Sequence, residues 1–334
     1  MNGIEIIGTG SYVPEFIADN NKFADFLDTS DEWITPRTGI KERHIMTDKP
    51  NHFMATEAAK KALENAKVDA KDIDLSLVSC CTPDFFYPSM SCLVQIGIGA
   101  DNAACLDVNS ACTGFISAMD VAQKFLASGQ YKTILIVSSE KLSSQQDYTD
   151  RSMCILFGDA AGAVVVRSSD RPYFSKLGAT GDDFEALYCK VNYQSNCPFY
   201  PEDRDNAFYN HRFDTFSKQN YLQSDGHAVY KFAVNAMSGA VKTVAADGGY
   251  SIDDIDLIIP HQANLRIIKK ATDILGADPA KVYTNIERLG NVSSACIPVA
   301  LDELNRQGRL HKGMKLCIVG FGAGLTYGAI IMEL

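Results

Sequence analysis

Two short motifs recur along this chain in the same order, and this repeat constrains the fold more than any other feature of the sequence. The motif DIDL at 72–75 returns at 254–257, an offset of 182 residues (254 minus 72). The motif SAC at 110–112 returns at 294–296, an offset of 184 residues (296 minus 112). Two motifs repeated at nearly one offset indicate an internal duplication.

Similar segments follow each copy of the second motif. A helix-like stretch and a glycine, Gly129 or Gly308, lead into a very apolar segment, TILIVSS from residue 133 or KLCIVGFG from residue 315. We therefore predict two βα-rich halves, at 1–170 and 171–334. Their apolar strands need helices on both faces of the sheet.

Cys112 lies where a strand-like segment turns into a helix-like one. The pattern predicts a short buried strand at 103–108 and then a helix up to Gly129, which is placed as a C-terminal cap. Unpaired N–H groups and the positive end of a helix dipole at such a turn favour a thiolate, which suits a nucleophile. The alternative is a small buried cysteine that only packs, one of ten in the chain.

The bulk composition excludes several classes of protein. The ten cysteines lie mostly in apolar segments, without a CxxC pair or a Cys/His cluster at zinc spacing, so we expect reduced thiols and no metal site. The net charge of −10 argues against general nucleic-acid binding. No membrane-length apolar stretch and no signal-peptide pattern is present, which predicts a soluble, cytoplasmic protein outside the membrane.

Candidate partners for Cys112 come from the second half. His261 directly follows the strand-like segment DLIIP, at the strand edge where open α/β sheets place their sites. Asn291 precedes the second SAC motif by three residues, so we expect both side chains to face the centre where Cys112 emerges. A lone histidine is more often structural, but this strand stops abruptly in polar residues.

The glycine run GFGAG at 320–324 does not have the spacing of a dinucleotide-binding motif, which is GxGxxG. We expect its glycines to bring backbone N–H groups near Cys112.

Two further segments have open interpretations. Trp33, the only tryptophan, is close to Arg37 and Arg43 in the segment 28–45, so it either stacks on an adenine ring or anchors an amphipathic surface turn. The segment 178–223 is rich in aromatic and polar residues without periodicity. It is interpreted as an ordered excursion, either a lid or contact loop or a surface insertion without a role in function.

Seven segments form a specific set when taken together. They are DEWITPRTGIKERHI, NSACTGF, DRSMCILFGDAAGA, GHAVYKFAV, PHQANLRII, GNVSSA and GFGAG. With them the chain resembles the thiolase-fold condensing enzymes, most closely the beta-ketoacyl-acyl carrier protein synthase III family, over essentially its whole length. The resemblance implies an α/β, thiolase-like fold with two pseudo-symmetric βα halves and buried mixed sheets in a layered αβαβα arrangement.

The resemblance also implies a reaction, the decarboxylative Claisen condensation that initiates fatty-acid biosynthesis. Cys112 would attack an acyl-CoA primer, acetyl or short and branched, and hold the acyl group. His261 and Asn291 would bind the thioester carbonyl of malonyl-acyl carrier protein as neutral hydrogen-bond donors while it loses CO2. The backbone N–H groups of Cys112 and Ala323 would form the oxyanion hole. No cofactor is implied besides the CoA thioester substrate.

Binding roles follow from the same resemblance. The CoA-binding residues would be Trp33, Arg37, Arg151, Gly226, Ala263 and Asn264. The acyl pocket would be lined by Tyr87, Leu156, Phe157 and Phe321, with Tyr87 reaching across from the partner of a homodimer. An acidic acyl carrier protein would dock on a basic patch of Lys231, Arg266, Lys269 and Lys270, which is otherwise a solvated helix face.

The chain departs from the family pattern in three places. Ala323 stands in what is commonly an all-glycine run, Ser224 and Tyr230 replace larger apolar and phenylalanine positions, and the segment 178–223 is longer than expected. The alternative function is therefore a specialised-pathway condensing enzyme or an acyltransferase of this fold that uses a longer or aromatic acyl group. A third possibility, a silent subunit that only binds a partner, is disfavoured by the intact set of Cys112, His261 and Asn291.

Overall fold

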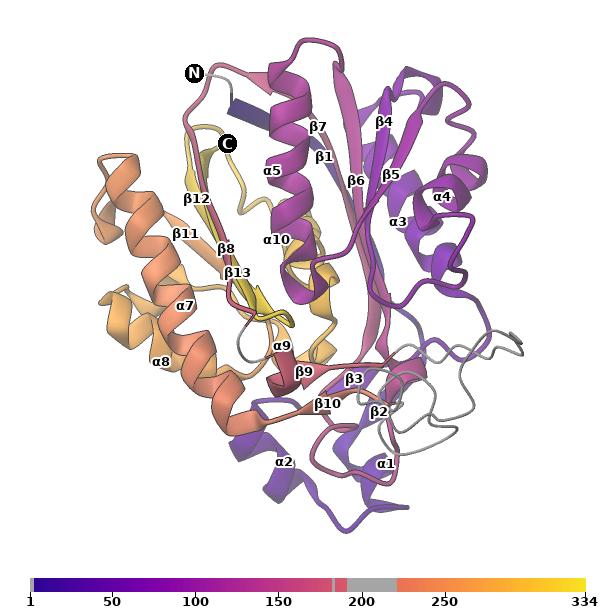
Figure 1. Ribbon diagram of the computed structural model, residues 1–334, viewed down its shortest axis with the longest axis vertical. Helices are drawn as coiled ribbons and strands as arrows, with labels where there is room; N and C mark the ends of the chain where they lie inside the picture. Colours follow the sequence, from indigo (N-terminus) through magenta and orange to yellow (C-terminus); the bar gives the residue numbers. More distant parts are fainter. Residues whose placement is uncertain (1–2, 182–183, 191–220) are drawn as a thin grey trace, which may run out of the picture.

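A computed structural model of the 334-residue chain describes residues 3–181, 184–190 and 221–334. Two mixed sheets organise these residues (Figure 1). The first has the strand order β1-β7-β6-β4-β5, and its described strands are β1 (Gly3–Tyr12), β4 (Leu75–Ser79), β5 (Ala104–Val108), β6 (Thr133–Lys141) and β7 (Asp159–Ser169). The second has the order β11-β12-β13-β8, with β8 (Tyr173–Ala179), β11 (Leu257–Pro260), β12 (Lys315–Gly322) and β13 (Thr326–Glu333).

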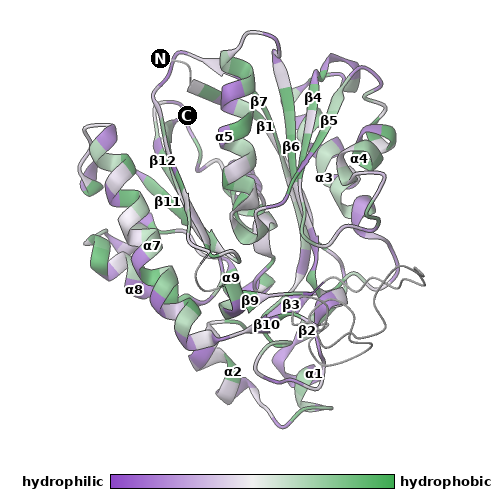
Figure 2. Ribbon diagram, viewed as in Figure 1, coloured by the Kyte–Doolittle hydropathy of each residue, from purple (hydrophilic) through white to green (hydrophobic). Residues whose placement is uncertain are grey.

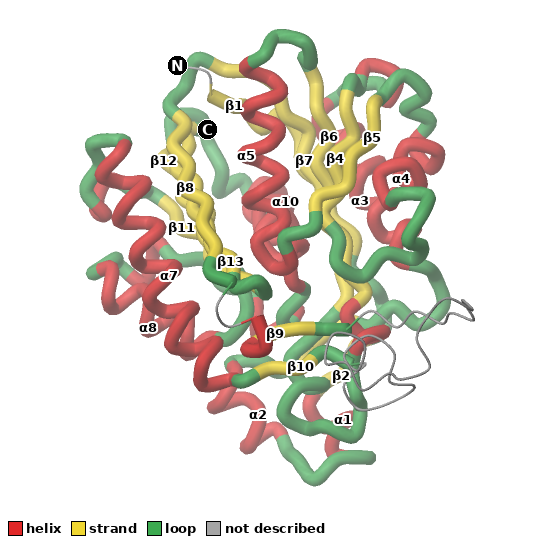
Figure 3. The backbone as a smooth tube through the Cα atoms, viewed as in Figure 1, coloured by secondary structure: helices red, strands yellow, loops and turns green. Residues whose placement is uncertain are grey.

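Helices cover both faces of each sheet (Figures 1 and 3). The first sheet is covered on its outer face by α3 (Asn51–Ala66) and α4 (Met90–Ile98). The second is covered on its outer face by α7 (Gly226–Asp247) and α8 (Leu265–Leu275). Between the sheets lie α5 (Gly114–Ala127) and α10 (Cys296–Arg306). This is the layered αβαβα arrangement that the family resemblance implied.

Shorter elements lie mostly at the ends of the sheets. The small sheets pair β2 (Ile17–Asp19) with β3 (Glu42–His44) and β9 (Leu187–Tyr188) with β10 (Gln223–Ser224). The short α-helices are α1 (Asn20–Ala24), α2 (Asp31–Thr38) and α9 (Ile286–Leu289). Single 3-10 turns are η1 (Ala70–Asp72), η2 (Ala111–Thr113), η3 (Leu142–Gln145), η4 (Phe184–Ala186), η6 (Ile252–Asp254), η7 (Pro279–Lys281) and η8 (Ser293–Ala295).

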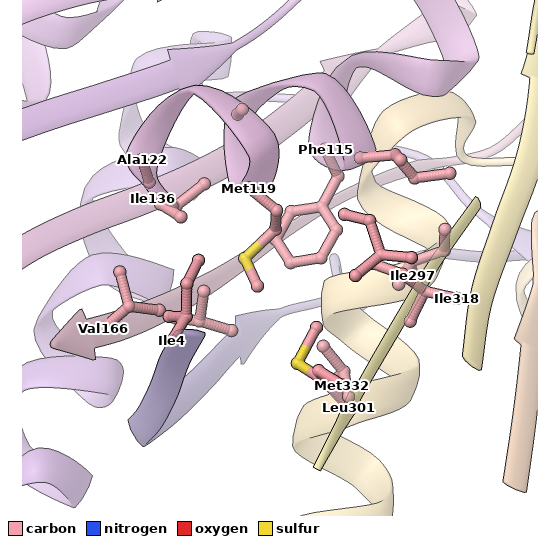
Figure 4. Close-up of a cluster of buried hydrophobic side chains, with 14 of the residues drawn as sticks. Ile4, Phe115, Met119, Ala122, Ile136, Val166, Ile297, Leu301, Ile318 and Met332 are labelled. Atoms are coloured by element: carbon pink, nitrogen blue, oxygen red, sulfur yellow. The ribbon is translucent and has the colours of Figure 1, made fainter. Parts of the chain in front are cut away.

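The central core is built around the buried face of α5. Phe115 and Met119 of this helix lie among side chains of both sheets and of α10 (Figure 4). The neighbours include Ile136 of β6 on one side and Ile318 of β12 on the other, and all of these side chains are fully buried. Hydrophobic residues run along β4 and β6, whereas α7 and α8 alternate between hydrophobic and hydrophilic residues (Figure 2). Each layer is therefore apolar where it faces a sheet.

The repeat is visible in the order of the elements, but with one offset instead of two. The turn η1 begins at Ala70 and η6 at Ile252, and the turns η2 and η8 begin at Ala111 and Ser293, each pair 182 residues apart (252 minus 70, 293 minus 111). Ala111 and Ser293 have nearly the same left-handed φ, 45° and 49°.

The sequence match between the two SAC motifs, at an offset of 184, is therefore wrong as a structural equivalence. At the offset of 182, Cys112 corresponds to Ser294, and Gly114 at the start of α5 corresponds to Cys296 at the start of α10. The left-handed residues Ala111 and Ser293 show which positions of the two turns correspond. The second SAC motif begins two residues after the position that corresponds to the first. The boundary between the predicted halves 1–170 and 171–334 stays a prediction.

The strand predicted at 103–108 is present as β5, but the prediction that it is buried is wrong. Its burial pattern is mostly exposed, and Leu106 at its centre keeps 41% of its surface accessible. The reason is that β5 is an edge strand, paired only with β4 in the order of the first sheet. An edge strand of a single chain has one open side.

The predicted excursion at 178–223 lies largely outside the described residues. At its start, β8 continues the second sheet to Ala179, and at its end β10 pairs with β9. The helix α7 begins at Gly226, directly after β10, because the side chain of Asp225 accepts hydrogen bonds from the amides of His227 and Ala228 and caps it.

Candidate active site

Cys112 lies in the turn η2, between β5 and α5. The turn is tightly fixed, because a Cβ at Gly114 would lie only 1.9 Å from the hydroxyl oxygen of Ser79 in β4. Ala111, directly before the cysteine, is held in a left-handed conformation that is unfavourable for a residue with a side chain. The turn places Cys112 at the N-terminal end of α5, where it lines a cavity of about 550 Å³.

The thiol of Cys112 is protonated at neutral pH. Burial raises the pKa of Cys112 to about 12, although hydrogen bonds from the Ser293 hydroxyl and from the backbone N–H of Cys112 itself lower it. The carboxyl group of Glu140 raises this pKa further. The helix N-terminus favours a thiolate, but here the lost hydration of a buried anion outweighs the nearby donors.

The glycine run at 320–324 packs against the Cys112 turn, as expected from the sequence. A Cβ at Gly322 would lie 2.8 Å from the backbone nitrogen of Cys112, so this approach requires glycine. The hydroxyl of Thr326 lies 2.9 Å from that of Thr113 and donates to the carbonyl of Ala323 at 3.1 Å. These contacts tie the run to the Cys112 turn, and Ala323 lines the same cavity.

His261 follows β11 and is held by the neighbouring strand, since its amide donates to the carbonyl of Val319 at 2.8 Å. The side chain is 1% exposed and packs edge-on against the ring of Phe321. Burial lowers the pKa of His261 to about 3, so the imidazole is neutral at physiological pH. Among the described residues its Nδ1 has no hydrogen-bond partner. A neutral imidazole can donate one hydrogen bond and accept another.

Asn291 is oriented from both its backbone and its side chain. Its amide donates to the carbonyl of Leu156 at 2.8 Å, and its carbonyl accepts from the amide of Gly158 at 3.0 Å. Its side-chain Oδ1 accepts a 2.8 Å hydrogen bond from the backbone nitrogen of Ser293. With Oδ1 engaged in this way, Nδ2 is the group of Asn291 that remains as a donor.

The cavity brings together most of the residues proposed from the sequence. Its lining includes Cys112, Leu156, Phe157, Gly226, His261, Ala263, Asn264, Asn291, Phe321 and Ala323. Phe321 belongs to β12, Gly226 begins α7, Asn264 caps α8, and the others lie in turns and loops, among them η2 with Cys112. The nucleophile candidate and both donor candidates therefore line one cavity.

Trp33 and its two arginines form a separate group outside this lining. The guanidinium groups of Arg37 and Arg151 lie 4.6 Å and 5.1 Å from the centre of the Trp33 ring. Asn264, which lines the cavity, connects the two places because its Nδ2 donates to the carbonyl of Arg37 at 3.1 Å. The aromatic ring and its cations thus border the cavity on the side of α8.

Other proposed residues do not reach the cavity of the same chain. Tyr87 is 87% exposed and does not line it, although the neighbouring Phe86 does. The basic residues are exposed on the neighbouring helices α7 and α8, and they are Lys231, Arg266, Lys269 and Lys270.

Sequence reasoning missed several residues that the fold brings to the site. Ser293 donates its hydroxyl to the sulfur of Cys112, and Glu140 lies buried behind the turn that carries Ser293. The apolar wall of the cavity also includes Leu142, Met153 and Leu222. The polar SSA at 293–295 was a signal for Ser293, because it occupies the place of the first turn in the repeat. No local pattern marks Glu140 or Leu222.

Comparison with known proteins decides the family. A family model described as 3-oxoacyl-[acyl-carrier-protein (ACP)] synthase III matches residues 106–181, and one described as its C terminal matches residues 245–334. The chain is 44% identical over 335 residues to the beta-ketoacyl-[acyl-carrier-protein] synthase III of Clostridium acetobutylicum, covering 100% of this chain and 99% of that one. The chain belongs to the beta-ketoacyl-acyl carrier protein synthase III family. The resemblance inferred from the motifs is confirmed, as are the fold and the class of condensing, acyltransferase-type enzyme.

Solved structures of synthase III relatives share this architecture. The 3-oxoacyl-[acyl-carrier-protein] synthase III of Aquifex aeolicus VF5 is 37% identical, with a TM-score of 0.89 over 99% of this chain and 100% of that chain. The priming beta-ketosynthase of the R1128 polyketide biosynthetic pathway is 33% identical, with a TM-score of 0.88 over 99% of this chain and 96% of that chain. The same fold therefore also occurs in a protein that is named for a polyketide pathway.

No described helix is long and apolar enough to cross a membrane. Within the same residues, no three His, Cys, Asp or Glu side chains are grouped so that they could hold a metal ion.

Proposed function

We propose that this chain condenses an acyl-CoA primer, acetyl or short and branched, with malonyl-acyl carrier protein and releases CO2. The observation that carries the proposal is the single cavity lined by Cys112, His261 and Asn291. The cavity offers a nucleophilic sulfur and two neutral polar groups, a combination suited to an acyl-enzyme and then to an enolate.

In the first half-reaction, the sulfur of Cys112 bonds to the thioester carbon of the acyl-CoA. The bond from that carbon to the CoA sulfur breaks, and the proton of the thiol ends on the released CoA. Because the resting thiol keeps its proton, the step needs no net uptake or loss of a proton. The backbone N–H groups of Cys112 and Ala323 stabilise the oxyanion, a role supported by the close approach of Gly322 to the Cys112 nitrogen.

In the second half-reaction, the malonyl carboxylate leaves as CO2 and its electron pair forms the enolate of the thioester. His261 and Asn291 donate hydrogen bonds to the enolate oxygen. The neutral state of His261 and the engaged Oδ1 of Asn291 support this role. The enolate carbon then bonds to the acyl carbon, the Cys112 sulfur leaves, and one proton from solvent restores the thiol.

CoA binds with its nucleotide end on Trp33, Arg37 and Arg151. The ring can stack on adenine and the guanidinium groups can pair with phosphates, as their 4.6 Å and 5.1 Å distances from the ring allow. The pantetheine arm then passes Asn264, Ala263 and Gly226, which line the cavity leading to Cys112. The contact between Asn264 and Arg37 supports this single path.

The acyl group binds beside Leu156, Phe157 and Phe321, which line the same cavity. Leu142 and Met153 extend this apolar wall. One structure 33% identical to this chain is named as the priming beta-ketosynthase of a polyketide biosynthetic pathway. A longer or aromatic acyl group is therefore kept as an outcome of the experiment below.

The active assembly is a homodimer in which Tyr87 lines the acyl pocket of the partner. Support comes from exposed apolar residues around the edge strand β5, namely Phe85, Phe86, Tyr87, Ile96 and Leu106. The open edge of β5 can pair with a second copy. Such pairing would cover Tyr87, which is 87% exposed in the single chain.

The acyl carrier protein docks beside the cavity on α7 and α8. Gly226 and Asn264 line the cavity at the starts of these two helices, and Lys231, Arg266, Lys269 and Lys270 are exposed farther along them. A basic patch on a chain of net charge −10 would steer an acidic carrier.

Intact-mass measurement after incubation with a panel of acyl-CoAs tests the proposal. Acetyl-, isobutyryl-, octanoyl- and benzoyl-CoA are each added to the purified chain and to its Cys112→Ala variant. The proposal expects an acetyl or short branched adduct on the parent chain and none on the variant. If only octanoyl- or benzoyl-CoA forms an adduct, the chain is instead a specialised enzyme with a longer or aromatic primer. If no acyl-CoA forms an adduct, the proposed function is overturned.

A further inference from the structure

Glu140, at the end of β6, has a fully buried side chain that forms no salt bridge with any described residue. Its Oε1 accepts a 2.6 Å hydrogen bond from the Ser294 hydroxyl, and its Oε2 accepts one of 2.8 Å from the Thr82 hydroxyl. The amide and the thiol of Cys81 also donate to Oε2, at 3.1 and 3.2 Å. A buried carboxyl group is thus held entirely by neutral donors.

The donors come from two segments that the carboxyl group holds together. Ser294 belongs to the turn η8, whereas Cys81 and Thr82 follow β4. Thr82 cannot easily reverse its bond to Glu140, because its hydroxyl oxygen already accepts from the amide of Lys141 at 2.9 Å. The network therefore requires an acceptor at residue 140.

The turn η8 also makes hydrogen bonds to the side chains of two of the proposed catalytic residues, Cys112 and Asn291. The hydroxyl of Ser293 donates to the sulfur of Cys112 at 3.3 Å, and the amide of Ser293 donates to Oδ1 of Asn291 at 2.8 Å. Ser293 has a left-handed φ of 49°, which a residue with a side chain keeps only when its surroundings hold it. The hydrogen bond from the adjacent Ser294 to Glu140 provides such a hold.

The internal repeat shows how Glu140 differs from its counterpart. At the offset of 182, Ser294 corresponds to Cys112, and Glu140 corresponds to Gly322 (140 plus 182). Each turn packs against the strand of the other half, η2 against β12 and η8 against β6. Beside Cys112 the strand residue is a glycine, which lets the backbone of the nucleophile turn approach closely. Beside Ser294 it is a glutamate, whose carboxyl group accepts from the Ser294 hydroxyl.

We propose that Glu140 is a positioning residue of the condensation site. It holds the turn η8 so that Ser293 fixes the Cys112 sulfur and leaves Nδ2 of Asn291 as the donor toward the substrate. The inference rests on the proposed function. It adds that the turn η8, which is the repeat's second copy of the nucleophile turn and has Ser294 in place of Cys112, supports the turn η2 that carries the nucleophile. The carboxyl group also raises the pKa of Cys112, which gives the proposal a second readout.

Glu140→Gln tests this role, with Asp302→Asn as the matched control. The glutamine side chain has the same size as glutamate, but its NH2 group cannot accept a hydrogen bond. Either Ser294 or the segment with Cys81 and Thr82 therefore loses its acceptor. Asp302 is also a buried carboxylate, 2% exposed, but it accepts from Thr9 and Ser11 in β1, outside the cavity lining. The measurements are the kcat of condensation, the KM for acyl-CoA, the thermal midpoint and the pH dependence of Cys112 alkylation by iodoacetamide.

The expected result for Glu140→Gln is a kcat lowered on the order of tenfold to a hundredfold, as for a misplaced reacting group, with KM for acyl-CoA changed less than about twofold. Alkylation of Cys112 should shift to lower pH, so the thiol becomes more reactive while condensation slows. Asp302→Asn should lower only the thermal midpoint. If Glu140→Gln does not fold, Ser294→Ala, which removes one donor, should show the same kcat loss to a smaller extent.

Equal kcat values for the two variants, or an unshifted alkylation profile in Glu140→Gln, would overturn the positioning role. Failure of the parent chain to form an acyl adduct at Cys112 would instead overturn the proposed function, so the two failures are distinguishable.

Discussion

The hydroxyl of Ser293 lies 3.3 Å from the sulfur of Cys112, although the two residues are far apart in the chain and belong to opposite turns of the internal repeat. This bond is the direct link between the segment that carries the nucleophile and the segment that orients Asn291. It also lowers the pKa of Cys112 against the larger effect of burial. The two half-reactions that we propose therefore share one hydrogen-bonded support.

Replacing Ser293 by alanine should slow acylation of Cys112. The sulfur loses its hydrogen-bond donor, so the developing thiolate is less stabilised, and we expect a rate loss of about tenfold at pH 7 because one bond to a charged group is removed. The backbone amide of Ser293 still holds Asn291 Oδ1. Ser128→Ala, which removes an exposed hydroxyl near the other end of α5, should leave acylation unchanged. Stopped-flow acylation by acetyl-CoA measures both, and equal rates would rule out this role of Ser293.

Asn291→Ala should separate the two half-reactions. The variant keeps Cys112 and its cavity, so an acyl adduct should still form from acyl-CoA. Decarboxylation of malonyl-acyl carrier protein should fall by about a hundredfold or more, as for the loss of one oxyanion donor. Parallel measurement of adduct mass and CO2 release checks this result. A variant that decarboxylates at the parental rate would remove Asn291 from the proposed mechanism.

The pH dependence of the site follows from the pKa values of its two buried groups. Because the pKa of His261 is lowered to about 3, the rate of decarboxylation should show no inflection near pH 6.5. The unfolded chain binds a proton on this histidine below about pH 6.5 and the folded chain does not. The contribution of His261 to the free energy of unfolding should therefore decrease as the pH falls from 6.5 toward 3. Rate profiles and urea denaturation between pH 5 and 8 test both expectations.

The raised pKa of Cys112 predicts a late alkylation profile. With a pKa of about 12, the rate of reaction with iodoacetamide should keep rising above pH 10, whereas an ordinary thiol, with a pKa of about 8.5, is almost fully ionised there and its rate has levelled off. The site is followed by peptide mass analysis, with free cysteine as the reference. A plateau for Cys112 below pH 10 would contradict the effect of burial.

Gly322→Ala should inactivate the enzyme without unfolding it. The added Cβ would lie 2.8 Å from the Cys112 nitrogen, so the turn that carries the nucleophile must shift. Gly239→Ala is the matched control, because Gly239 lies within the helix α7 and a Cβ added there would have no other side chain or neighbouring segment within 4 Å. The control should keep its activity and gain about 0.5 to 1 kcal/mol of stability. Full activity of Gly322→Ala would show that the close approach of the glycine run is not needed.

The sequence predicted those features that local patterns encode. The DIDL motif recurs because its second aspartate has a local task in each half. Asp74 accepts from the amide of Thr133 at the start of β6, and Asp256 accepts from the amide of Lys315 at the start of β12. The repeat also led to the two βα halves and to Asn291, and the predicted turn and strand end led to Cys112 and His261. The layered arrangement came from the resemblance to the family.

The remaining features depend on contacts between distant segments. Ser294 and Glu140 are separated by 154 residues in the chain, and no periodicity indicates that they meet. The SAC motifs do not occupy equivalent positions, because the equivalence of the two turns is set by the left-handed backbone at Ala111 and Ser293. Residue identity does not reveal that conformation. The exposure of β5 could not be foreseen because an apolar strand at a sheet edge has the same composition as a central one.

The most direct test of the account is the coupling between the acyl group on Cys112 and the loss of CO2. The acyl-enzyme is isolated free of acyl-CoA and mixed with malonyl-acyl carrier protein labelled in its free carboxyl group, and the adduct mass and labelled CO2 are followed together. The account predicts one CO2 released for each acyl group lost from Cys112, with the acyl group recovered on the carrier protein. An adduct that persists, or an acyl group that leaves by hydrolysis without CO2 release, would contradict it.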